Sequence, residues 1–251
     1  MSLTNLRIVL VRPHYSGNIG AVARAMRNVG ISDLALVNPA RLCREQAETM
    51  AVHARDVLDS MQVHASLRAA VADCGLVVGT TCRPGLYREG ALTPRTLAPH
   101  VVTAAVANRV ALVFGPEDSG LANDDLRLCH QLLTIPTDPV YPSLNVAQAV
   151  LLCCYEVFLA RQEPSASVAP RPLAVAERQE LMYEKLKSAL LKIGFLHGDN
   201  PEHIMFALRR ILGRAGLEDR DVRILLGLAR QIEWYASGGW RLHHQNPGAG
   251  A

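Results

Sequence analysis

Short runs of apolar residues alternate with longer amphipathic stretches over the first two thirds of the chain. The runs predict buried strands at Leu6–Val11, Leu34–Val37, Leu76–Gly79, Val110–Phe114 and Leu132–Ile135. Each run is continuous rather than alternating, which is typical of strands covered on both faces. Helix-period patterns lie between them, over 18–29, 44–54, 65–72 and 96–107, and again from 146 onward. This alternation predicts an α/β fold with a parallel sheet and helices on both faces.

The pattern changes near residue 161. Residues 161–173 are rich in Pro, Ser and Ala and lack periodicity, which predicts a linker. Three helical patterns follow, at about 174–193, 201–215 and 219–236, with no strand between them. We therefore expect one domain over 1–160, the linker, a helical extension over 174–240, and a disordered tail over 241–251.

Composition is that of an ordinary globular protein, with 49% hydrophobic and 20% charged residues. No apolar stretch reaches the roughly 20 residues needed to span a bilayer, and the first residues have too short an apolar core for a signal peptide. The six cysteines never form a Cys-x-x-Cys pair, which favours reduced thiols over a zinc site or a disulfide frame. We expect a cytoplasmic protein without a membrane partner.

The formal net charge of +3 is unevenly distributed. Residues 1–170 carry fourteen Arg and fourteen acidic side chains, whereas residues 171–251 carry twelve basic and nine acidic ones. Such an excess occurs on surfaces that bind polyanions and also on solvated helix faces. It directs the search for a polyanionic partner to the extension.

Two loops of small residues follow the fourth and fifth predicted strands. Gly115 and Gly120 flank Glu117 in the first loop, and Pro142–Asn145 leads into the next helix. Glycine lets the backbone approach a ligand closely, and α/β sheets bind ligands beyond the carboxyl ends of their strands. Taken singly, each loop could equally be a turn, with Asn145 capping a helix.

The first strand is followed by a glycine-containing loop and a helix, for which Asn18 is a candidate N-cap and Gly30 a stop signal. Arg24 falls on the polar face of this helix. Its guanidinium could bind a phosphate or a developing negative charge, or could simply be solvated. No phosphate loop and no GxGxxG signature follows the strand, which disfavours kinases and dehydrogenases. No histidine pair has metal-ligand spacing, so no metal is expected.

Three ordered motifs resemble those of the SpoU/TrmH branch of the SPOUT RNA 2′-O-methyltransferases. They are NIGAVAR from Asn18, FGPEDSGL from Phe114, and IP followed by SLNVAQA and YE over 135–156. The opening strand, the VVGT strand end and the Leu208-Arg209-Arg210 helix are similar to the TrmJ-type tRNA methyltransferases, which modify the ribose at nucleotide 32. The resemblance implies a deep trefoil knot formed by segments 114–121 and 132–156. It also implies a homodimer in which the arginine of one subunit faces the cofactor of the other.

The resemblance further implies which residues act. S-adenosylmethionine would be held, largely by backbone groups, at Thr80, Thr81, Cys82, Gly115, Ile135, Ser143, Leu144 and Asn145. The candidate catalytic residues are Arg24, Asn18, Ser143 and Glu117, and the candidate RNA contacts are Arg24, Arg27, Arg83, Arg209 and Arg210. Because a guanidinium with a pKa above about 12 accepts protons poorly, we assign Arg24 to stabilising negative charge rather than to acting as a base.

Two prolines depart from the family pattern. Pro142 removes a backbone amide beside Ser143, and Pro84 can redirect the loop after Cys82. The leading interpretation remains a tRNA ribose 2′-O-methyltransferase. The alternatives are a ribosomal RNA substrate and an RNA-binding protein that keeps the fold without catalysis. The intact Arg24, Glu117 and Asn145 favour the enzyme, since a binding protein need not retain them.

Overall fold

A parallel six-stranded sheet forms the centre of the protein, for which a computed structural model describes residues 3–40, 42–83, 85, 90–162, 170–197 and 201–239. The strand order is β3-β2-β1-β5-β4-β6, and every pairing is parallel. The strands are β1 (Leu6–Val11), β2 (Asp33–Val37), β3 (Gln62–His64), β4 (Leu76–Thr80), β5 (Val110–Phe114) and β6 (Gln131–Leu133). The predicted α/β fold class is confirmed.

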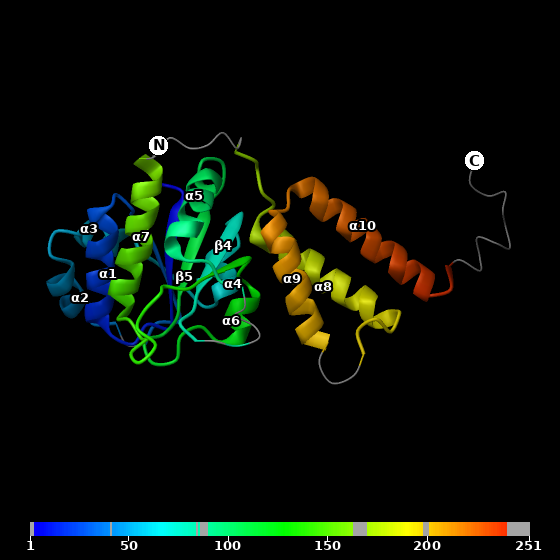
Figure 1. The fold of residues 1–251 in the computed structure, drawn as a ribbon, viewed down its shortest axis with the longest axis horizontal. Helices are drawn as coiled ribbons and strands as arrows, with labels where there is room; N and C mark the ends of the chain where they lie inside the picture. The colour runs from blue at the N-terminus through cyan, green and yellow to red at the C-terminus, as the bar shows by residue number, and fades with distance from the viewer. Residues whose placement is uncertain are drawn as a thin grey trace.

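Helices cover both faces of this sheet (Figure 1). Helices α1 (Ser16–Asn28), α2 (Arg44–Ala51), α3 (Arg55–Ser60), α5 (Pro94–Ala105) and α7 (Val146–Gln162) cover one face, and α4 (Leu67–Val71) and α6 (Asn123–Arg127) cover the other. Alternate residues of β1 point to opposite faces of the sheet. Ile8 and Leu10 pack under α1 and α7, whereas Val9 and Val11 pack under α4. The continuous apolar runs in the sequence are explained by this double coverage.

Helix α1 begins earlier than expected. It starts at Ser16, with Tyr15 at the N-cap position, so the assignment of Asn18 as N-cap is wrong. The predicted stop at Gly30 is confirmed, since Gly30 has φ +77° and the N–H of Ile31 bonds back to the carbonyl of Met26. Placing Asn18 inside the first turn leaves its side-chain amide available for contacts elsewhere.

The extension consists of α8 (Ala176–Lys192), α9 (Pro201–Ala215) and α10 (Asp219–Ala236), as predicted. It has a small core of its own around Met182, Tyr183 and Val222. It also covers part of the sheet, because Ala176 and Phe206 join the apolar layer beside α4 and α6. The extension is therefore packed against the first domain.

The described part of the predicted linker is held in place. The backbone N–H of Leu173 donates to Asn108 Oδ1 at 2.7 Å, and that of Ala174 donates to the carbonyl of Leu217 at 2.8 Å. Residues 163–169 and the predicted tail at 241–251 lie outside the described residues.

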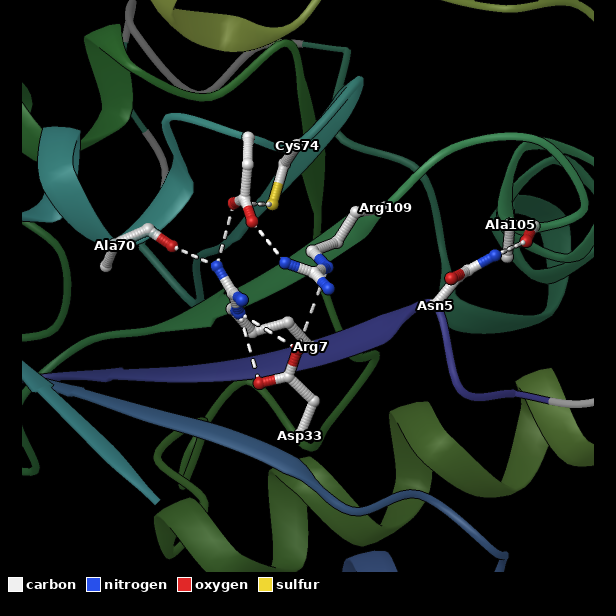
Figure 2. Close-up of polar contacts among 8 residues, drawn as sticks. Asn5, Arg7, Asp33, Ala70, Cys74, Ala105 and Arg109 are labelled. Carbon is white, nitrogen blue, oxygen red and sulfur yellow. Dashed lines mark hydrogen bonds and ion pairs between the residues drawn. The ribbon is translucent and has the colours of Figure 1, made fainter. Parts of the chain in front are cut away.

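A buried arginine and its charged partners close the amino ends of the strands (Figure 2). Arg7, which is 3% exposed, donates from Nε to Asp33 at 3.1 Å and from Nη1 to Asp73 at 2.8 Å. Its Nη1 also donates to the carbonyl of Ala70, and Arg109 pairs with Asp73 from the other side. This cluster ties four neighbouring strand starts together at the end of the sheet away from the predicted site.

Candidate active site

A cavity of ≈ 350 Å³ opens beyond the carboxyl ends of β4, β5 and β6. Its lining includes the predicted cofactor residues Thr80, Thr81, Cys82, Gly115, Ile135, Ser143 and Leu144. Asn145 is not among the lining residues. The remaining walls come from Phe114, Pro116, Leu121, Leu133, Pro142, Val146 and Ala149, most of which are apolar, and from Arg83 and residues 117–120. Segments far apart in the sequence thus meet around one small-molecule pocket, in the size range typical of ligand sites.

The two glycines of the 114–121 loop are required by the loop itself. A Cβ at Gly115 would lie 2.2 Å from the backbone nitrogen of Leu121, which no side chain tolerates. Gly120 has φ +64°, in the left-handed region that favours glycine. Both glycines therefore let the chain fold back tightly after β5, which shapes one wall of the cavity.

A chain of hydrogen bonds joins the three motif segments. The Asn18 amide Nδ2 donates to Glu117 Oε1 at 2.9 Å, and Asn145 Nδ2 donates to Asn18 Oδ1 at 3.0 Å. Glu117 Oε2 accepts from the backbone N–H of His14 at 3.0 Å, and Asn145 Oδ1 accepts from the N–H of Ala147 at 2.9 Å. Asn145 therefore caps α7 and also fixes it to α1.

The charge of Glu117 suits this bracing position. Burial acts to raise the pKa of its carboxyl, but hydrogen bonds from the Asn18 amide and from the backbone N–H of His14 outweigh burial and hold the pKa below its usual value. The side chain is therefore an ionised acceptor near neutral pH. This position suits a brace between loops better than a general base, which must release its hydrogen-bond donors before it takes up a proton.

Of the three arginines predicted to contact RNA in the first domain, two lie outside the cavity lining. Arg83 lines the cavity, and its Nη2 donates to the carbonyl of Asp118 at 3.2 Å. Arg27 is exposed and pairs with Asp56 at 3.4 Å. Arg24 is exposed on α1 and does not line the cavity of its own chain.

The two arginines predicted on α9 lie in the packing of the extension. Arg209 Nη2 donates to Glu180 Oε2 at 2.9 Å, and its guanidinium lies 4.2 Å above the ring of Tyr183. Only 16% of the Arg209 side chain is exposed. Arg210 is half-buried, and burial, followed by the nearby charge of Arg214, lowers the pKa of its guanidinium.

Sequence reasoning missed one ion pair near the site. Arg12 directly follows β1, has φ +48°, and pairs through its guanidinium with Asp125 of α6 at 2.5 Å. Asp125 also accepts from the N–H of Ala122, just after the 114–121 loop. The pair joins residues that are 113 positions apart, so no local pattern could have revealed it.

The fold and the cavity define a class. Residues 5–155 match the family described as "SpoU rRNA Methylase family", and residues 177–242 match "tRNA methyltransferase TrmJ, C-terminal domain". The chain belongs to the SpoU methylase family, and the resemblance inferred from the three motifs is confirmed.

Similar proteins cover both parts of the chain. A tRNA (cytidine/uridine-2′-O-)-methyltransferase TrmJ of Citrobacter koseri is 41% identical over 236 residues, covering 92% of this chain and 97% of its own length. The crystal structure of TrmJ from Z. mobilis ZM4 matches with a TM-score of 0.77 and 34% identity, over 90% of this chain and 98% of that one. The structure of a probable methylase family protein from Haemophilus influenzae matches with a TM-score of 0.61 and 32% identity, over 94% of this chain and 98% of that one.

Two further observations concern the described residues alone. None of their helices has the length and apolarity to cross a membrane. Their His, Cys, Asp and Glu side chains nowhere gather in groups of three or more suited to a metal ion.

Proposed function

We propose that this protein methylates a ribose 2′-hydroxyl of tRNA, at nucleotide 32 of the anticodon loop, with S-adenosylmethionine as methyl donor. The observation that carries the proposal is that two family motifs, at 114–121 and 135–156, line one cavity, and that the motif beginning at Asn18 is held to both of them by the hydrogen bonds of Asn18 to Glu117 and Asn145. The match of residues 177–242 to a tRNA methyltransferase domain favours tRNA over ribosomal RNA as the substrate. Residues 1–160 would form the catalytic domain, knotted at 114–121 and 132–156, and residues 174–240 would form the tRNA-binding extension.

The cavity fits the proposed donor. Its apolar walls at Leu121, Leu133 and Ile135 suit a flat adenine ring, and the loop backbones at Thr81 and Leu144 offer polar groups at its edges. S-adenosylmethionine would supply an already activated methyl group. The residues of this chain then have to orient the ribose oxygen and manage its proton and charge.

Arg24 is the candidate for managing that charge. Its guanidinium can donate hydrogen bonds to the developing alkoxide and to a neighbouring phosphate, while the hydroxyl proton leaves to phosphate or water. Ser143, at the edge of the cavity, would orient the hydroxyl. Because Glu117 already accepts bonds from two segments, we assign it to holding the loops together.

A homodimer would bring Arg24 to a cavity. Arg24 is exposed on α1 and lies outside the cavity of its own chain. Helix α7, which packs beside α1, exposes Leu151, Leu152 and Tyr155. An apolar face beside an exposed arginine fits a two-fold interface in which each Arg24 serves the partner's cavity.

The experiment is methyl transfer from labelled S-adenosylmethionine to tRNA, followed by mass spectrometry of nuclease fragments. We expect the label on the ribose of nucleotide 32, and no labelling of a tRNA that carries a 2′-deoxyribose at that nucleotide. Ribosomal RNA fragments serve as competing substrates in the same assay. Label at another tRNA nucleotide would refute the position, and label in ribosomal RNA alone would refute the substrate.

A further inference from the structure

The outer face of α10 carries basic and apolar side chains without an acid. Arg220, Arg223, Ile224, Leu228 and Arg230 are all exposed, and their spacing places them on one side of the helix. Trp234 and Tyr235 extend the same face by a further turn, with 39% and 57% exposure. Figure 1 shows α10 at the side of the extension away from the sheet. The face is therefore open over most of the helix.

The acidic residues of α10 are directed to other partners. Asp219 pairs with Arg178 at 2.9 Å, and Asp221 accepts from the backbone N–H of Glu218 at 2.9 Å. Glu233 pairs with Lys192 at 3.0 Å and accepts from Ser188 at 2.8 Å. These contacts leave the positive charge of the outer face uncompensated by its own helix.

The three arginines differ from the ion-paired bases of the extension. Within the described residues, Arg220, Arg223 and Arg230 form no ion pair, whereas Arg178, Lys187, Lys192 and Arg209 each pair with a carboxylate. With a rise of 1.5 Å per residue, the three arginines span about 15 Å along the helix, a length over which a nucleic-acid strand presents several phosphates.

We propose that the outer face of α10 binds the sugar-phosphate backbone of tRNA, at a distance from the reacting nucleotide. The inference rests on the proposed function and adds the surface that anchors the substrate. Arginines that have no carboxylate partner can donate bidentate hydrogen bonds to phosphates. The interleaved Ile224, Leu228 and Tyr235 are exposed and would contribute apolar and stacking contacts to sugars and bases. Charge complementarity favours RNA over a protein partner.

The test compares two variants with the same change in net charge. In the first, Arg220→Gln, Arg223→Gln and Arg230→Gln are combined. In the matched control, Arg171→Gln, Arg178→Gln and Lys192→Gln remove three bases that are already ion-paired. Each protein is assayed for tRNA KM and kcat, for tRNA affinity against salt concentration, for S-adenosylmethionine affinity and for dimer mass. Circular dichroism checks that α10 stays folded, and an Arg→Lys triple variant at the first three positions keeps the charge.

For the first variant we expect KM to rise about tenfold or more and the slope of log affinity against log salt to flatten by about two, with kcat and cofactor affinity unchanged. The control and the Arg→Lys variant should stay within about threefold of the parent protein. Unchanged affinity and slope, or equal losses in the first variant and the control, would overturn the inference. A loss of dimer mass would assign the face to a second copy of the chain instead. If the parent protein itself methylates no tRNA, the proposed function fails rather than this surface.

Discussion

Glu117 gives the site a dependence on pH that can be measured. Its pKa is lower in the folded protein than in the unfolded chain, so its ionised form stabilises the folded state. That contribution is complete above the unfolded-state pKa and is lost as pH falls through the lowered folded-state pKa.

We expect Glu117→Gln to cost about 1–2 kcal/mol of unfolding free energy at pH 7, because the amide has a single acceptor oxygen and can accept from only one of Asn18 and His14. The difference from the parent protein should shrink at an acidic pH below the lowered folded-state pKa of Glu117, where the parent carboxyl is also neutral. Urea unfolding at both pH values measures it. As a control, Asp118→Asn alters an exposed neighbour whose carboxylate accepts from Ser119. A pH-independent difference would contradict the assignment of Glu117 as an ionised brace.

At the residue scale, sequence motifs located most of the cavity. Thr80, Gly115 and Ser143 were predicted because each belongs to a motif that ends a strand or starts a helix. The roles of Asn18 and Asn145 in joining loops were not predicted, since the pairing of two residues 127 positions apart leaves no local signal. The N-cap assignment of Asn18 was wrong because α1 begins two residues earlier, at Ser16.

At the element scale, α9 is fitted closely to the sheet. A Cβ at Gly213 would lie 2.6 Å from the carbonyl oxygen of His130, just before β6. The contact is with a backbone atom, which cannot move away by rotation as the end of a flexible side chain can. The junction between the extension and the first domain therefore depends on a residue without a side chain.

We expect Gly213→Ala to loosen α9 from β6 and to increase amide hydrogen exchange in both elements by at least about tenfold. Gly227→Ala on α10 is the matched control, because nothing lies within 4 Å of its added Cβ. That control should stabilise the extension by about 0.5–1 kcal/mol, since alanine favours a helix over glycine. Equal exchange in both variants would show that the junction adjusts without cost.

The long elements were predictable, as were the short β6 and α4, whereas three other short elements were not. The runs that became β1, β2, β4 and β5 and the long helices α7 to α10 follow from periodicity. Helix α3, strand β3 and helix α6 have six, three and five residues, too few for a period to be distinguished from chance.

At the scale of the whole molecule, the order of the strands could not be obtained from the apolar pattern. Any of the runs could pair with any other, because each is apolar on both sides. The alternation of strands and helices predicted a parallel sheet, and the family resemblance added the expected knot. Neither the apolar pattern nor the family resemblance predicted how α8 and α9 pack on the sheet through Ala176 and Phe206.

The proposed dimer predicts that two inactive variants can restore each other. Arg24→Ala should bind S-adenosylmethionine but lose methyl transfer, whereas Gly115→Ala should lose the cofactor because its Cβ would meet Leu121. After the two proteins are unfolded and refolded together, about a quarter of parental activity should return, because half of the random dimers are mixed and each mixed dimer holds one intact site. Each variant refolded alone is the control. No recovery, in a sample shown by tagged pull-down to contain mixed dimers, would place Arg24 and its cavity in the same chain.

A chain of hydrogen bonds leads from Ala147 through Asn145 and Asn18 to Glu117, and in each bond the donor is on the Ala147 side. A carboxylate can only accept, so the Asn18 amide has to present its nitrogen to Glu117 and its oxygen to Asn145. Asn145 in turn has to present its nitrogen to Asn18 and its oxygen to the first turn of α7. The carboxylate at one end and the backbone N–H of Ala147 at the other thus require the same order of donors and acceptors along the chain. A proton on Glu117 would turn that end of the chain into a group that can donate as well as accept, so the order of donors and acceptors would then be fixed from the Ala147 end alone.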